Sequence, residues 1–234
     1  MSKIRIYLEK DFFKDQNILL EMKHIHYLKN VMRKKNGDKI FAFNNQEEWE
    51  CMFSLGKEIS LKPINVVRKI NRIPDVWVCF SLIKIKSINN LVEKISEIGV
   101  TKIIPITSEF SEKLKLNFNR LKKISIEATE QCNAISPPLI NKIVDLETLI
   151  FNWDEERLII LCDESGGNSI LSLNTLINKY TKIAIFIGPI GGWSKKDKKL
   201  FNDKKIFRVT LGENILKADT AAISSLSCVK ALML

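Results

Sequence analysis

Short, largely apolar runs constrain the fold of this chain more than any other feature. They occupy residues 76–82, 158–162, 183–187 and 206–211. Such runs are typical of strands in a parallel sheet that is covered on both faces. Helical patterns alternate with them, as in residues 88–98, which are followed by a glycine. Residues 73–234 therefore predict an α/β domain in which helices cover both faces of a parallel sheet.

Residues 1–72 show a different pattern and predict a small β-rich domain. Strand candidates lie at residues 5–8, 39–43, 49–55 and 59–67. One helical stretch, residues 26–33, places Leu28, Val31 and Met32 on one face. The pattern changes between Arg68 and Pro74. We therefore place the domain boundary between residues 72 and 73.

The composition is that of a globular protein, with 45% hydrophobic and 27% charged residues in a chain of 234. No apolar run approaches the roughly eighteen residues of a transmembrane helix, and the N-terminus lacks the apolar core of a signal peptide. The five cysteines are scattered and odd in number. We therefore expect no membrane span, no disulfide framework, no metal site, and a location in the reducing cytoplasm.

The net charge of +10 is spread unevenly along the chain. Residues 1–74 hold 15 Lys and Arg against 9 Asp and Glu, whereas residues 75–234 hold 22 against 18. A basic domain favours a polyanionic partner such as nucleic acid, although a chain rich in Lys, Ile and Asn can acquire this charge by composition alone. The run Arg33-Lys34-Lys35 has two interpretations, a cation at a helix C-terminus or a phosphate contact.

Two of the apolar runs end in glycine, at Ile187-Gly188 and at Leu211-Gly212. The carboxyl ends of parallel strands are where open α/β sheets bind ligands, and glycines there allow the backbone to approach a ligand closely. Neither loop has the spacing of a nucleotide-phosphate motif. Ile215-Leu216 supplies an apolar wall suited to an adenine face. Asp219-Thr220 has two interpretations, a helix cap or a functional site.

Two segments, read together, resemble the ribosomal RNA small subunit methyltransferase E family, SPOUT-class enzymes that methylate N3 of a uridine. They are Gly188-Pro189-Ile190-Gly191-Gly192 and the stretch from Leu211-Gly212 through Ile215-Leu216-Lys217 to Asp219-Thr220-Ala221. The likeness extends over the whole chain and includes Arg5-Ile6-Tyr7, residues 26–38 and Glu130-Gln131-Cys132.

The resemblance implies a fold, a cofactor and partners. The C-terminal domain should be a trefoil-knotted parallel sheet, and the N-terminal domain a PUA-like β-barrel that binds RNA. The cofactor should be S-adenosyl-L-methionine, the substrate 16S ribosomal RNA, free or within the assembled 30S subunit, and the enzyme a homodimer. The cofactor should contact Leu161, Cys162, Ile187, Gly188, Gly191, Gly192, Leu211, Gly212, Ile215, Leu216 and Thr220.

The implied reaction requires help at uridine N3, because this nitrogen carries a proton at neutral pH. A nearby cation would stabilise the developing anion, and a carboxylate would accept the proton. Lys217 is our candidate cation, and Asp219 or Glu130 our candidate carboxylate. Phosphate contacts are expected from Arg5, Arg33, Lys34 and Lys35.

The chain departs from the family pattern at several positions. Ile190 stands where a glutamate is usual, Lys217 and Asp219 replace an arginine and a glutamate, and Phe110 and Ala134 replace arginines. Lysine does not reproduce the bidentate contacts of arginine. Two alternatives therefore stay open. One is a SPOUT 2′-O-ribose methyltransferase, although the asparagine-arginine signature of that group is not evident. The other is an RNA-binding homologue with impaired catalysis.

Overall fold

The computed structural model describes residues 3–70 and 74–233, which form two compact units. The first unit comprises residues 1–73 together with residues 129–137, and the second comprises residues 74–128 and 138–234. The expected domain boundary, between residues 72 and 73, lies outside the described residues. Within those residues, no helix combines the length and the apolar character needed to cross a membrane.

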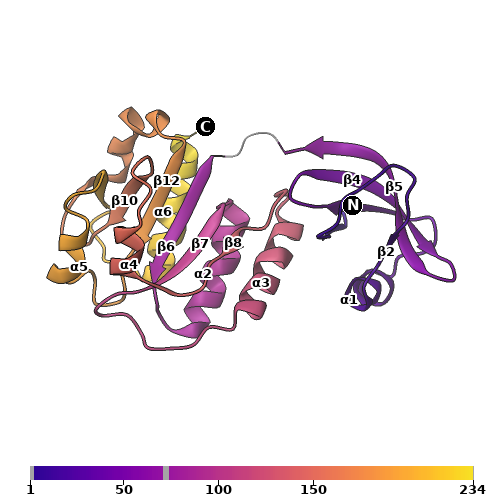
Figure 1. Ribbon diagram of the computed structural model, residues 1–234, viewed down its shortest axis with the longest axis horizontal. Coiled ribbons are helices and arrows are strands. Elements are labelled where there is room, and N and C mark those ends of the chain that lie inside the picture. Colours follow the sequence, from indigo (N-terminus) through magenta and orange to yellow (C-terminus); the bar gives the residue numbers. More distant parts are fainter. Residues whose placement is uncertain (1–2, 71–73, 234) are drawn as a thin grey trace. The chain divides into compact units, whose positions relative to one another are not determined.

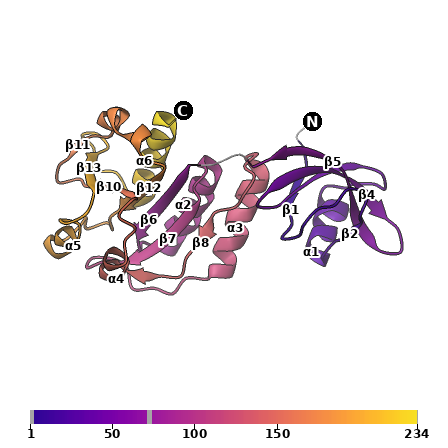
Figure 2. The ribbon, with the colours of Figure 1, turned by 45° about the horizontal axis from the view of Figure 1, so that its top comes forward.

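The first unit contains a curled five-stranded sheet (Figure 2). Its strands, in spatial order, are β1 (Arg5–Tyr7), β3 (Lys39–Phe43), β4 (Glu47–Leu55), β5 (Ile59–Lys69) and β2 (Ile18–Leu19). Alternate residues such as Ile40, Cys51 and Phe53 face a common core. No pairing between β1 and β2 is present among the described residues, so this curled sheet is a half-barrel, which is consistent with the PUA-like β-barrel that we expected.

The helix of the first unit differs from the expected one. It consists of α1 (Met22–Ile25) followed by the π-helical segment η1 (His26–Val31). Leu28 is buried but Val31 is 57% exposed, so these two residues, expected on one face of the helix, lie in different environments. A π-helix closes its hydrogen bonds over five residues instead of four, which rotates successive side chains away from the positions that an α-helical period predicts.

The second unit contains an eight-stranded sheet in which every pair of strands is parallel, as expected (Figure 1). Its central order is β13 (Ile206–Thr210), β10 (Leu158–Cys162), β12 (Lys182–Ile187), β6 (Asp75–Ser81) and β7 (Lys102–Thr107). Short strands complete its edges: β11 (Asn168–Ser169) pairs with β13, while β8 (Leu139–Ile140) and β9 (Val144–Asp145) both pair with β7.

Helices cover both faces of this sheet, which confirms the expected fold class. One apolar core joins Val78 and Phe80 of β6 to α2 (Ile85–Ile98), α3 (Phe118–Gln131) and α6 (Ala218–Leu232). The other joins the intervening Cys79 to α4 (Leu146–Phe151) and to Leu200 and Phe201 at the end of α5 (Lys195–Leu200). Alternate residues of one strand thus enter opposite cores.

The connection before β12 is less regular than the sequence predicts. The sequence predicts a helix near residues 170–179, but these residues form two 3₁₀ segments, η2 (Ile170–Thr175) and η3 (Ile177–Lys179). The expected capping box before α5 is confirmed, since Ser194 Oγ accepts from the Asp197 amide at 3.0 Å and the Ser194 amide donates to Asp197 Oδ2 at 3.1 Å.

The last helix returns across the sheet. After β13, which lies beside β10, α6 packs against α2, β12 and β6. This return brings the residues between β13 and α6 next to the carboxyl ends of β10 and β12.

Candidate active site

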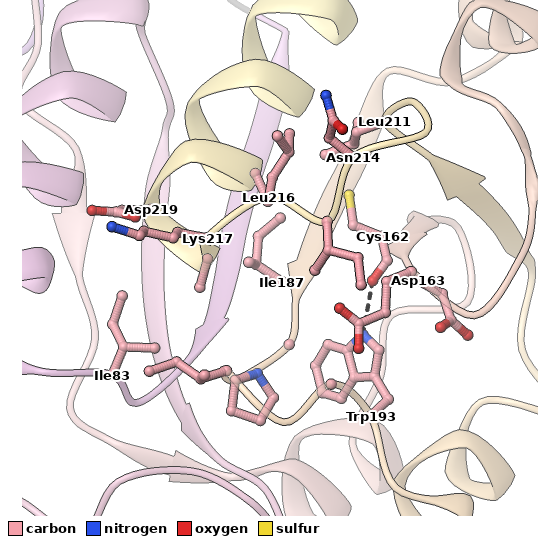
Figure 3. Close-up of a pocket in the computed structure, with 18 of the residues that line it drawn as sticks. Ile83, Cys162, Asp163, Ile187, Trp193, Leu211, Asn214, Leu216, Lys217 and Asp219 are labelled. Carbon is pink, nitrogen blue, oxygen red and sulfur yellow. Dashed lines mark hydrogen bonds between the residues drawn. The ribbon is translucent and has the colours of Figure 1, made fainter.

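A pocket of about 410 Å³ opens at the carboxyl ends of four neighbouring strands, β13, β10, β12 and β6 (Figure 3). Its size lies in the usual range for sites that bind small molecules, and its place is the usual one in open parallel sheets. The pocket is lined by residues 83–84 after β6, 162–164 at the end of β10, 187–190 and 192–193 after β12, and 209–219 between β13 and α6.

The loop after β12 is a tight turn whose glycines are needed for steric reasons. The Gly192 amide donates to the Pro189 carbonyl at 2.9 Å, and Gly192 has a φ of +70°. A Cβ atom at Gly192 would lie 2.8 Å from Oε1 of Glu164, and one at Gly188 would lie 3.2 Å from the Trp193 ring. A side chain at Gly192 would require Glu164 or the turn to shift and would be strained at this φ, and one at Gly188 would press on the Trp193 ring.

Trp193 joins this loop to the neighbouring strand. Its indole Nε1 donates a hydrogen bond to the Cys162 carbonyl at 2.9 Å, drawn as a dashed line in Figure 3. Its ring packs edge-on against Phe201, with centroids 5.8 Å apart. Trp193 was not among the predicted site residues. Its place directly after the paired glycines of the loop could have indicated that it belongs to the site.

Asp163 fixes the loop after β10. Its carboxylate forms an ion pair with Lys198 of α5 at 2.8 Å and accepts hydrogen bonds from the Ser165 amide and hydroxyl at 3.0 and 2.8 Å. Burial by itself would raise the pKa of Asp163, but the hydrogen bonds from Lys198 and Ser165 outweigh burial, so this pKa lies below its usual value. A carboxylate with so many partners is a structural anchor rather than a free base.

Cys162 contributes an apolar surface to the pocket rather than a nucleophile. Burial raises the pKa of its thiol to about 12, so the side chain is neutral at physiological pH. In the part of the chain that the structure describes, no three His, Cys, Asp or Glu side chains are gathered in a way that would hold a metal ion.

Lys217 and Asp219 lie where the loop after β13 enters α6. The helix begins at Ala218 with Lys217 as its N-cap residue, so the interpretation of Asp219 as the helix cap is wrong. The Asp219 carboxylate accepts only from the adjacent Thr220 amide, at 3.1 Å. In Figure 3 the Lys217 and Asp219 side chains extend toward the same edge of the view, away from Cys162 and Trp193. Within the described residues, neither forms an ion pair.

Most residues that we expected around a cofactor are gathered here. Those that line the pocket are Cys162, Ile187, Gly188, Gly192, Leu211, Gly212, Ile215 and Leu216. Three do not line it. Leu161 belongs to the apolar core on one face of the sheet, because alternate residues of β10 point to opposite faces. Gly191 lies against Phe110, and Thr220 lies one residue beyond Asp219 in the first turn of α6.

Two other predicted site residues, Arg5 and Glu130, belong to the first unit and do not line the pocket. Arg5 is 4% exposed, and its guanidinium contacts Glu48 at 2.7 Å and the Thr129 carbonyl at 2.9 Å. Its predicted role as a phosphate contact is therefore wrong, because its donors are used inside the unit. The Glu130 carboxylate accepts from the Tyr7 amide at 2.8 Å.

The remaining predicted RNA contacts lie at the surface. Arg33, Lys34 and Lys35 follow η1, where the Lys34 amide donates to the Leu28 carbonyl at 2.9 Å. Arg33 and Lys35 are exposed, and Lys34 is half-buried. Arg33 has a φ of +52°, an uncommon backbone conformation for a residue other than glycine. None of the three side chains forms an ion pair with a described residue.

Comparisons with known proteins agree with this arrangement. A family model of the RNA methyltransferase domain matches residues 71–230, and one of the RNA methyltransferase PUA domain matches residues 23–62. Two similar proteins are ribosomal RNA small subunit methyltransferase E of Rickettsia conorii and ribosomal RNA small subunit methyltransferase E 2 of Borreliella burgdorferi. The first is 29% identical over 99% of this chain and 97% of its own length. The second is 30% identical over 92% and 91%.

A solved structure has the same fold. The ribosomal RNA small subunit methyltransferase E from Neisseria gonorrhoeae, bound to S-adenosyl methionine, superposes with a TM-score of 0.89 at 21% identity, over 99% of this chain and 98% of that one. The expected SPOUT-type sheet and PUA-like unit are thereby confirmed. This chain belongs to the ribosomal RNA small subunit methyltransferase E family of RNA methyltransferases.

Proposed function

We propose that this protein transfers a methyl group from S-adenosylmethionine to N3 of a uridine in 16S ribosomal RNA. The observation that carries the proposal is the pocket at the carboxyl ends of β10, β12 and β13, in a chain of this family. Its relatives in Rickettsia and Borreliella are named as small-subunit rRNA methyltransferases, and the Neisseria structure contains S-adenosyl methionine.

The pocket fits this cofactor in size and in chemistry. Ile83, Ile187 and Leu216 supply apolar surface suited to an adenine ring. Gly188 and Gly212 lack side chains that would keep a ligand away from the backbone. The carboxylates of Glu164 and Glu213 also line the pocket, and negative charge suits a ligand with a positively charged sulfonium and ammonium.

The proposed chemistry assigns separate roles to two side chains. S-adenosylmethionine supplies an electrophilic methyl group when it is bound. Lys217, as an ammonium close to the target base, would stabilise negative charge that develops on the uracil ring, and Asp219 would accept the N3 proton. We prefer Asp219 to Glu130 as the acceptor because, of these two residues, Asp219 lines the pocket together with Lys217 and Glu130 does not.

We also propose that Arg33, Lys34 and Lys35 contact RNA phosphates. A left-handed backbone conformation costs a residue other than glycine about 1–2 kcal/mol, and glycine is the usual residue directly after a helix. Arg33 occupies such a position with a φ of +52°. Local stability therefore favours glycine there, whereas a phosphate contact requires the arginine side chain.

A homodimer in the cytoplasm is the assembly we propose, acting on free 16S rRNA or on the assembled 30S subunit. Ile190 and Ile215 line the pocket and are 70% and 76% exposed. Apolar side chains exposed together at a site are suited to contact with a second copy of the chain or with the substrate.

The test is methylation of small ribosomal subunits from a strain that lacks this protein. Incubation with the protein and S-adenosylmethionine should produce 3-methyluridine in 16S rRNA, detected by mass spectrometry of nucleosides. A 2′-O-methyl product would favour the ribose methyltransferase alternative. Binding of RNA without cofactor binding in calorimetry, and without product, would favour the impaired homologue.

A further inference from the structure

The positive charge of the second unit is concentrated in one segment. Residues 195–208, which form α5, β13 and the turn between them, hold seven Lys and Arg against two Asp. The other residues of 75–234 hold 15 Lys and Arg against 16 Asp and Glu. The entire positive excess of this part of the chain therefore lies in fourteen residues that directly follow the pocket loop.

Some lysines of this segment form ion pairs within the chain and others do not. Lys198 and Lys204 form ion pairs with Asp163 and Glu155, at 2.8 and 2.6 Å. By contrast, the three other lysines of α5 are exposed, and no described residue forms an ion pair with them: Lys195, Lys196 and Lys199. Lys196 and Lys195 precede Lys199 by three and four residues. The three lysines therefore share one side of the helix, here named the α5 lysine face.

The stability of α5 does not explain this face. Lys195 and Lys196 lie in the first helical turn, where the helix dipole disfavours cations. Lys195 and Lys199 are like charges four residues apart, which repel each other. The helix already has its stabilising groups in the Ser194–Asp197 capping box and in Phe201, which lies in the apolar core. These three exposed cations have no ion-pair partner among the described residues and are therefore available to an anion outside the chain.

We infer that the α5 lysine face binds phosphate groups of the RNA substrate next to the pocket. This inference rests on the function proposed above and adds a second RNA contact to it. Lys195 follows the pocket residue Trp193 by two positions, and α5 belongs to the same compact unit as the pocket. Phosphates bound there would place a neighbouring nucleotide close to the site of methyl transfer. Lysine ammonium groups gain affinity for a polyanion mainly by releasing its counterions.

The test compares wild-type protein with the triple variant Lys195→Gln/Lys196→Gln/Lys199→Gln. Its affinity for purified, unmethylated small ribosomal subunits should fall about 10²-fold near 0.1 M salt, and the slope of log affinity against log salt should decrease by about 2 to 3. The KM for subunits should rise by a similar factor while kcat and S-adenosylmethionine affinity stay unchanged. Replacement of the same three lysines by arginine should retain the wild-type affinity.

The matched control is Lys113→Gln/Lys115→Gln/Lys142→Gln, which removes three exposed lysines of the same unit that neither line the pocket nor belong to α5. Its affinity should stay within about twofold of the wild type. An equal loss in the control, or an unchanged salt slope in the α5 variant, would overturn the inference while the proposed function stands. If the wild type itself neither binds nor methylates subunits, the proposed function is wrong and this inference is wrong with it.

Discussion

Two regions of this protein each contain a cation and a carboxylate that are close in the structure. They differ in whether these charges form ion pairs. In the first unit, Arg5 and Glu48 are both buried and in contact at 2.7 Å, and Arg68 also pairs with Glu48. In the pocket of the second unit, Lys217 and Asp219 have no ion-pair partner among the residues described. Charges with internal partners stabilise a fold, whereas charges without them beside a cavity are available to a ligand.

In the first unit, loss of a partner of the buried ion pair should lower the free energy of unfolding. Arg5→Met leaves the Glu48 carboxylate buried with only Arg68 as its partner, which should destabilise this unit by about 3–5 kcal/mol. Urea unfolding, followed by hydrogen exchange of the β3 and β4 amides, measures the loss. Lys57→Met, at an exposed lysine of the same unit, should change stability by less than about 0.5 kcal/mol.

A second substitution sharpens the result for Arg5. Arg5→Met/Glu48→Met removes both buried charges together, and part of the lost stability should return, because no buried carboxylate is left with too few partners. Arg68 loses Glu48 in this variant, but it is 29% exposed and still donates to Asn133. Cofactor affinity should be unchanged in both variants, since neither residue lines the pocket. A single variant as stable as the wild type would break the comparison.

The pocket should respond through its chemistry. Lys217→Met should lower single-turnover methyl transfer about 10²- to 10³-fold, because the developing charge on the base loses its cation. Unfolding free energy should change little, since Lys217 has no ion-pair partner within the described residues. Lys84→Met is the control, because Lys84 also lines the pocket but is not assigned a role. Full turnover in Lys217→Met would remove this residue from the mechanism.

The glycine turn should respond through cofactor affinity. Gly192→Ala places a Cβ 2.8 Å from the Glu164 carboxylate at a φ of +70°, so Glu164, which lines the pocket, or the turn must shift. S-adenosylmethionine binding should weaken about tenfold in calorimetry, if a shift of this loop costs about 1–2 kcal/mol. Gly37→Ala has the same kind of backbone strain, with a φ of +86°, but no atom within 4 Å of the new Cβ. It should lower stability without weakening cofactor binding.

The smallest effect should come from the loop anchor Asp163, and it depends on pH. Its pKa in the folded protein lies below the usual value, so its stabilising contribution is complete above the unfolded pKa of about 4 and is lost as the pH falls through the folded pKa. Asp163→Asn should cost about 1 kcal/mol at pH 7. The difference from wild type in urea unfolding should shrink below about pH 4; a constant difference would show that charge is not the cause.

The loops that line the pocket could be predicted from the sequence because the end of a strand has a local sequence pattern. Apolar runs that end in glycine mark strand exits, and the exits of adjacent parallel strands must lie at one edge of the sheet. Eight of the eleven predicted cofactor contacts line the pocket for this reason. Leu161 does not line the pocket, because the strand period of two points its side chain to the opposite face from Cys162.

The sequence could not show which charges have partners. Arg5 and Arg33 look alike in the chain as basic residues of a basic domain. Arg5 is buried because Glu48 and the carbonyls near Thr129, more than forty and more than one hundred residues away, surround its guanidinium. Arg33, which follows the π-helical segment, is exposed and forms no ion pair with a described residue.

Local patterns alone determined the fold class, the edge of the sheet that holds the site, and the capping box of α5, since each depends on residues close together in the chain. Only the tertiary structure decided that Arg5 is structural, that Trp193 joins two strands, and that the lysines of α5 divide into paired and unpaired groups. The physical reason is that an ion pair or hydrogen bond depends on distance in space. Residues such as Lys198 and Asp163, 2.8 Å apart, are separated by 35 positions in the sequence.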